Sequence, residues 1–332
     1  MERLALIGGI LLAAVVVLGD MVGDHTIQID FDEDDISHVQ RAAYVEPRAG
    51  EAAEQAYAAT DIRVMYAAAL VEVIPEDRTD VAVAIRNPGH APMPVVKHDG
   101  ERLEIDGLLA RRINECRQEG GAILEGYGDL ARDQLPQITL RVPRTAEIRF
   151  QGAVFGRIGA MENLDLRVGG CGRTEIADVS GSLEIDNDGS GEVVAAAARN
   201  AEIHLTGSGE ASIGAVSESL VLDLAGSGGV TAASLRGALE TQIAGSASAV
   251  VNGGAVTTAE LDIAGSGEIR IRAPVERLEA DIAGSGDIIV AGAVGAVDAS
   301  LAGSGDVRVA SVSGPVSKSV IGSGDVIVGR LE

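Results

Sequence analysis

The sequence predicts an all-β protein, a parallel β-helix or solenoid with about 19 residues per coil. Three observations predict it. A Gly-Ser-Gly-acid motif recurs along the second half of the chain, with steps of 18 to 20 residues between its first glycines. Apolar and polar residues alternate on both sides of each motif, as in strands with one buried face. The chain has no Trp, three Phe and four Tyr, so a thin aliphatic core is expected.

Residues 1–23 are predicted to be a signal peptide or a membrane anchor. An uncharged apolar run, Leu4–Gly19, follows Arg3 and ends before Asp20, as in a secretory signal. The run is short for a complete membrane span, so cleavage and anchoring both stay open, with a buried N-terminal helix as the alternative. We expect export to the cell envelope, on the periplasmic side or at the surface.

The next two segments differ in composition. Residues 24–60 read as an acidic, Ala-rich spacer, with helix-favouring residues at Glu51–Ala59. Residues 61–150 read as a β segment that starts or caps the solenoid, because a stack must cover its terminal apolar face. Arg111–Gly120 is expected to form a loop or a helical turn. Five short runs rich in β-branched residues predict strands: Val71–Ile74, Val81–Ile85, Leu103–Ile105, Ile138–Val142 and Glu147–Phe150.

Residues 151–332 are the repeat array. One unit, Leu278–Ala296, reads LEADIAGSGDIIVAGAVGA and predicts two short strands, a tight glycine corner and a looser return. Glycine suits a corner that needs unusual backbone angles and must stack closely on the next corner. The predicted corners begin at Gly189, Gly207, Gly226, Gly245, Gly265, Gly284, Gly303 and Gly322.

Stacked acids are the main candidate for a metal site. Carboxylates at coil spacing must face water, accept backbone N–H bonds or bind a cation, for which calcium is the oxygen-seeking choice. The candidates in the column after the corners are Glu268, Asp287, Asp306 and Asp325. A second polar column holds Asp186, Asp223, Asp262 and Asp281, interrupted by His204, Gln242 and Ser300. These interruptions favour turn stabilisation over weak calcium binding.

The two cysteines, Cys116 and Cys171, predict a disulfide in an exported chain. Cys171 lies in a Gly-Cys-Gly variant of the repeat corner. Closing a loop of this size would contribute about 4 kcal/mol in the chain-entropy model. Two unrelated buried thiols are the alternative, and the pair is too sparse for a zinc site.

Charge and motifs narrow the function. The net charge of −24 argues against nucleic-acid binding and against binding to anionic lipid, so membrane contact is expected only through the N-terminal segment. No Lys-Ser/Thr follows the Gly-Ser-Gly corners, and no HExxH or G-x-S-x-G motif occurs. The sequence therefore predicts a protein that is not an enzyme and has no cofactor, apart from the calcium option.

The repeats resemble the putative auto-transporter adhesin, head GIN domain family. The residues that carry this resemblance are AGSGDI at Ala283–Ile288, AGSGDV at Ala302–Val307, IGSGDV at Ile321–Val326 and the preceding segment Leu135–Gly159. The resemblance implies an exported, β-helical, non-catalytic cell-envelope module, adhesin-like or structural. The alternatives are a polymer-forming scaffold resembling bactofilins, which would self-associate through the solenoid ends, and a weak calcium-binding repeat protein. The ligand or partner stays open.

Overall fold

The computed structural model describes residues 40–117 and 120–329. The predicted signal or anchor segment, residues 1–23, lies outside these ranges. Residues 24–39 of the predicted spacer lie outside them as well. No helix within the described ranges is long and apolar enough to cross a membrane. The strands belong to the compact unit that begins at Gln40.

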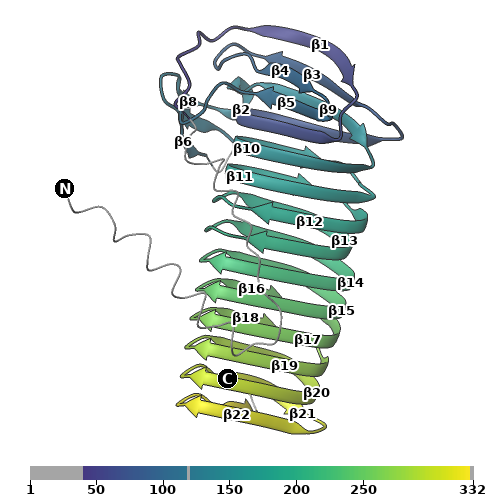
Figure 1. The fold of residues 1–332 in the computed structure, drawn as a ribbon, viewed down its shortest axis with the longest axis vertical. Helices are drawn as coiled ribbons and strands as arrows, with labels where there is room; N and C mark the ends of the chain where they lie inside the picture. Colours follow the sequence, from purple (N-terminus) through teal and green to yellow (C-terminus); the bar gives the residue numbers. More distant parts are fainter. Residues whose placement is uncertain (1–39, 118–119, 330–332) are drawn as a thin grey trace, which may run out of the picture. The chain divides into compact units, whose positions relative to one another are not determined.

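The predicted parallel β-solenoid is confirmed. Successive coils pair in parallel, and equivalent residues about 19 positions apart lie side by side on neighbouring strands, for example Leu205 with Leu224 and Ile243 with Ile263. Figure 1 shows these strands lying one above another along the stack. They are β10 Thr145–Ile158, β11 Asn163–Ile176, β12 Val179–Asn187, β13 Glu192–Leu205, β14 Glu210–Gly226, β15 Gly229–Gly245, β16 Ser248–Val251, β17 Gly254–Gly265, β18 Glu268–Ile271, β19 Val275–Gly284, β20 Asp287–Gly303, β21 Val307–Val312, β22 Val316–Gly322 and β23 Val326–Val328.

Several coils contain one long strand where two short ones were expected. β14 and β15 each run for 17 residues from the acid position to the next corner glycine. The segment predicted as a loose return is thus part of the strand, because its backbone stays hydrogen-bonded to the neighbouring coil. A shift of register between Gly237 and Ala238 marks the bend, as β-bulges do where a strand changes direction.

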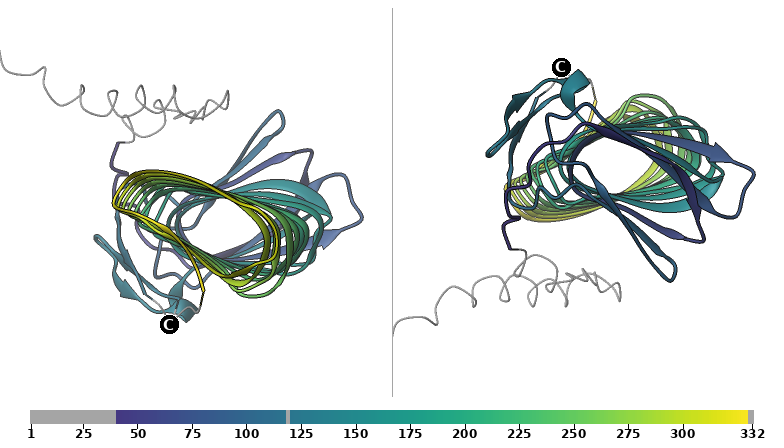
Figure 2. Two further views of the ribbon diagram at one scale, coloured as in Figure 1. Left: turned by 90° about the horizontal axis from the view of Figure 1, so that it is seen from below. Right: turned by 90° about the horizontal axis from the view of Figure 1, so that it is seen from above.

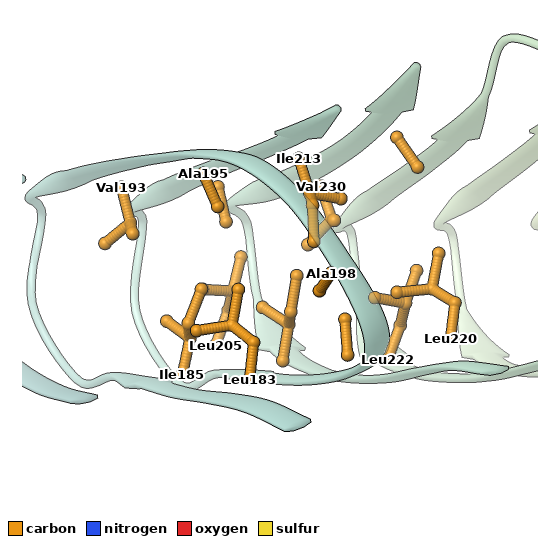
Figure 3. Close-up of a cluster of buried hydrophobic side chains, with 14 of the residues drawn as sticks. Leu183, Ile185, Val193, Ala195, Ala198, Leu205, Ile213, Leu220, Leu222 and Val230 are labelled. Atoms are coloured by element: carbon orange, nitrogen blue, oxygen red, sulfur yellow. The ribbon is translucent and has the colours of Figure 1, made fainter. Parts of the chain in front are cut away.

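The core is an aliphatic column between the two walls of each coil. Figure 3 shows Val193 and Ala195 on one wall facing Leu183, Ile185 and Leu205 on the other. Burial alternates along the strands, so that β14 buries Ala211, Ile213, Val216, Leu220, Leu222 and Leu224. No aromatic residue follows Phe155 in the sequence, which agrees with the thin core expected from composition.

A cap of mixed strands covers the first coil. β2 (Asp61–Glu76) pairs in parallel with β10 and so extends the stack by one strand on the N-terminal side of the array. Around it lie β1 Gly50–Tyr57, β3 Val81–Asn87, β4 Val95–Asp99, β5 Arg102–Asp106 and β9 Gln137–Pro143. β3 runs antiparallel to β1 and β9, and β4 runs antiparallel to β5. The five strand runs predicted in this segment fall within β2, β3, β5, β9 and β10 and are confirmed, while the boundary expected at residue 150 falls inside β10.

Strand β1 corrects one local expectation. Of the helix-favouring run Glu51–Ala59, residues 51–57 lie in this strand, and none of the run is helical. β1 pairs with the side of β3 that β9 leaves unpaired. Helix propensities differ by less than about 1 kcal/mol per residue among ordinary residues. Pairing the backbone groups of an exposed sheet edge therefore outweighs them.

A small antiparallel sheet packs beside the cap. It contains β6 Ile113–Cys116, β7 Ala122–Leu124 and β8 Gly128–Leu130, followed by a 3-10 turn at Arg132–Gln134. Its own buried cluster includes Leu109, Leu124, Leu135 and Phe155. The expectation of a loop or helical turn at Arg111–Gly120 is thus wrong for residues 113–116. Figure 2, viewed along the stack, shows this sheet outside the superimposed coils.

Candidate functional site

The corner glycines form one stacked column. Gly284 has a φ of +136°, and a Cβ there would lie 2.3 Å from the backbone oxygen of Gly265. Both the backbone angle and the close approach therefore require glycine. Gly207 has no left-handed φ, but its Cβ would lie 2.5 Å from the oxygen of Gly189. The predicted corners stack in order at Gly189, Gly207, Gly226, Gly245, Gly265, Gly284, Gly303 and Gly322, and the column continues backwards to Gly170 and Gly152.

Hydrogen bonds run through this column. The backbone N–H of most corner serines donates to the carbonyl of a glycine in the preceding coil, as at Ser285 to Gly265 (2.9 Å) and Ser304 to Gly284 (2.9 Å). The hydroxyls of Ser266 and Ser285 lie 3.1 Å apart on the exposed side. The corners thus continue the hydrogen bonding of the sheet around each turn.

The acids after the corners are engaged in protein contacts. Asp287 Oδ1 accepts the N–H of Asp306 (2.9 Å), and Asp306 Oδ1 accepts the N–H of Asp325 (2.8 Å). Arg308 bridges Asp287 (3.1 Å) and Asp306 (2.6 Å). The hydrogen bond from Lys318 (2.7 Å) lowers the pKa of Asp325.

Glu268 completes the set of calcium candidates and lies beside Asp287 in register. Arg270 holds its carboxylate at 2.8 Å. In the described ranges, three metal-ligand side chains come within 4.8 Å of one another at one place, which is not this column. These contacts of the corner acids with backbone N–H groups and arginine are the kind that stabilise a turn.

The two cysteines form a disulfide that joins the small sheet to the solenoid. Cys116 ends β6 and Cys171 lies in β11, 55 residues later, with a Cα–Cα distance of 5.8 Å. Cys171 stands between Gly170 and Gly172, which both have a positive φ. The Gly-Cys-Gly corner is therefore the point where the side sheet is covalently attached to the coil.

The strands that precede the corners carry two outward columns of side chains, which are polar except at Val221. One column runs through Glu184, Glu202, Val221, Glu240, Glu260, Glu279 and Asp298, and the other through Asp186, His204, Asp223, Gln242, Asp262, Asp281 and Ser300. Burial raises the pKa of Asp262 to about 6, and the charges of Asp281, Glu279, Glu240 and Glu260 add to this rise. The outward face of these strands thus carries closely spaced carboxylates.

His204 lies among these carboxylates. Its Nδ1 is 3.1 Å from Asp223 Oδ2, and its Nε2 is 3.1 Å from Glu202 Oε1. The hydrogen bond with Asp223 is the main cause that raises the pKa of His204 to about 9. Burial raises the pKa of Asp186, against the charges of His204 and Arg167.

Sequence reasoning missed this cluster. His204 was noted only as an interruption of the polar column, whereas the register places it directly beside Asp186. The 18-residue step between Asp186 and His204, equal to the step between the corners at Gly189 and Gly207, is the signal that could have shown the contact.

The family comparison agrees with the resemblance seen in the repeats. Residues 238–330 match the family model described as "Putative auto-transporter adhesin, head GIN domain". The predicted family is confirmed over these residues. The head GIN domain match begins within β15 and takes in the coils that carry the regular Gly-Ser-Gly-Asp corners. A comparison with curated proteins finds no match.

Three solved structures with similarity to the chain come from species of Parabacteroides and Bacteroides. A putative lipid binding protein from Parabacteroides distasonis is 19% identical, with a TM-score of 0.40, covering 86% of this chain and 99% of the other. A putative adhesin from Parabacteroides merdae is 12% identical, with a TM-score of 0.38 and the same coverage. A putative adhesin from Bacteroides fragilis is 15% identical, with a TM-score of 0.33, covering 86% and 100%.

Proposed function

We propose that the chain is an exported, non-enzymatic β-solenoid that serves the cell envelope as an adhesin-like or structural module. The observation that carries the proposal is the head GIN domain match on coils whose corner acids are engaged in structural contacts. The disulfide supports export, since such bonds persist in oxidising compartments. The outward carboxylates supply a repetitive acidic surface, which suits recognition of a basic or cation-bridged partner.

Export is tested by fractionating cells that carry the chain with an epitope tag at either terminus. The proposal expects the C-terminal tag outside the cytoplasm, with protease accessibility from outside separating surface from periplasm. Loss of the N-terminal tag would indicate cleavage, and its retention with membranes would indicate an anchor. Recovery of both tags in the cytoplasm would refute export.

Adhesion is tested by comparing the source strain with a deletion strain and a complemented strain. Attachment is measured to inert surfaces, to animal cells and between bacteria. A complemented strain in which Glu240, Glu260 and Glu279 are changed to Gln separates the acidic face from the scaffold. If deletion changes envelope integrity but no form of attachment, the module is structural; if neither changes, the proposal fails.

A polymer-forming scaffold is the second candidate, and the last described coil favours it. Its exposed apolar side chains are Val316, Val320, Ile321, Ile327 and Val328. Against end-to-end pairing, Lys318 stands in register with buried Ala299 and so brings a charge to an inward position of the edge. Inward charges are a common device against edge pairing. Sedimentation at increasing protein concentration distinguishes the two outcomes.

A further inference from the structure

Three metal-ligating side chains meet on the outward face near the start of the array. Glu184 and Asp186 lie two residues apart on β12 and point to the same side of the sheet. β13 brings His204 next to Asp186. One potential ligand atom from each of the three lies within 4.8 Å of the other two. This is the spacing at which a single ion can contact all three.

The surroundings orient the imidazole. With Nδ1–H donating to Asp223 at 3.1 Å, a metal would bind at Nε2 and displace the proton from that nitrogen. A carboxylate on the second ring nitrogen is the usual support of a metal-bound histidine. Glu202 Oε1, 3.1 Å from Nε2, is placed to act as a further oxygen ligand. The His204 side chain is 28% exposed, so an ion can reach it from solvent.

A fourth carboxylate, that of Asp165, lies next to Glu184. Asp165 pairs with Glu184 across the adjacent strands. Its Oδ1 is buried and has no hydrogen-bond partner among the described residues. Its Oδ2 lies 3.6 Å from Arg167, which also approaches Asp186 Oδ2 at 3.5 Å. Glu184 and Asp165 also line a groove of about 440 Å³ between the cap and the first coils.

We propose that Glu184, Asp186 and His204 bind a divalent transition-metal ion of the zinc type. Zinc binds imidazole nitrogen and carboxylate oxygen, and sites with three protein ligands leave it a fourth position open. Calcium prefers six to eight oxygen ligands, so the histidine selects against it. The same outward column elsewhere presents Gln242, Asp262 and Asp281 in place of an imidazole. This inference does not depend on the adhesion proposal.

The test is calorimetric titration of the full, oxidised chain with zinc chloride at pH 8 after treatment with a chelator. Both cysteines are in the disulfide, so no thiol competes for the ion. We expect one zinc per chain, with calcium and magnesium at least tenfold weaker. His204→Gln is expected to weaken zinc binding at least tenfold, the scale seen even for outer-shell changes. Asp186→Asn is expected to weaken it in the same direction.

Two controls isolate the site. A variant with the other four histidines, His25, His38, His90 and His98, changed to Gln should bind zinc as the unaltered chain does, and Asp281→Asn should have no effect. X-ray absorption of the zinc-loaded unaltered chain should show nitrogen and oxygen ligands, a readout that does not depend on any variant folding. Absence of saturable zinc binding would overturn the proposal. So would unchanged binding in His204→Gln, equal affinity for calcium or an oxygen-only shell.

Discussion

Gly284→Ala tests whether the corner column is what allows the coils to stack. The substitution places a Cβ 2.3 Å from the backbone oxygen of Gly265 and 3.1 Å from its carbonyl carbon. A backbone oxygen in a stacked sheet cannot rotate away as a side chain could. The residue must also hold a φ of +136°, a region that costs a residue with a side chain about 1–3 kcal/mol. Overpacking adds about 1–3 kcal/mol, so we expect a loss of roughly 2–6 kcal/mol.

Gly253→Ala is the matched control in the same array. Its Cβ would lie 3.6 Å from the nearest atom, the oxygen of Ala233, and its backbone is not left-handed. Replacing glycine at a compatible position changes stability by less than about 1 kcal/mol, through the unfolded chain. The two variants thus make the same chemical change and differ only in backbone angle and space.

The assay is urea unfolding followed by circular dichroism, combined with amide hydrogen exchange. Repeat arrays can unfold in parts, so the exchange data locate the loss. In Gly284→Ala we expect lost protection in β19 and β20 and a lower unfolding midpoint, with β2 and β9 in the cap unchanged. If the two variants differ by less than about 0.5 kcal/mol, the glycines are not required by the corner, and the argument fails.

Four further measurements address other parts of the molecule. Cys116→Ser should lower the free energy of unfolding by up to about 4 kcal/mol, and protease cleavage within residues 107–135 should increase if β6 to β8 depend on the tether; an unchanged midpoint would show that the disulfide adds nothing. Asp262→Asn should stabilise the chain by about 1 kcal/mol at pH 7.5, after allowance for solvent screening, and by nothing at pH 3.5. The reason is that the pKa of Asp262 is about 6 in the folded state against the ordinary 3.8, so the ionised carboxylate destabilises the fold increasingly as the pH rises between these values. The same gain at both pH values would contradict this origin. Calcium should leave the melting temperature unchanged relative to chelator if Asp287 and Asp306 serve the corner, whereas a rise abolished by Asp306→Asn would establish the calcium site. Lys318→Ala should increase sedimenting assemblies at high protein concentration if this lysine protects the edge, while identical profiles of the two chains would remove that role.

The architecture could be predicted because the repeat is periodic. Alternation around each Gly-Ser-Gly corner specifies strands with one buried face, and the 19-residue step specifies which residues stack. The absence of aromatic residues beyond Phe155 limits the core to a narrow coil. These are local or regularly repeated properties, so the amino-acid sequence alone is sufficient to reveal them.

The cap and the side sheet could not be predicted in the same way. β1 is a strand because β3 leaves an edge to be paired, although its own residues favour a helix. β6 forms against β7 and is tied to the solenoid through Cys171. Such pairings depend on partners far along the chain, and no local propensity encodes them.

The composition and period by themselves determined the solenoid, its aliphatic core, its glycine corners and its acidic surface. Only the tertiary structure decided what the acids do. It brought arginine and backbone N–H groups to the corner carboxylates, and it set His204 among Glu184, Asp186, Glu202 and Asp223. The physical reason is that a period states which residues stack, whereas charge balance and ligand geometry depend on which side chains meet around each one in space.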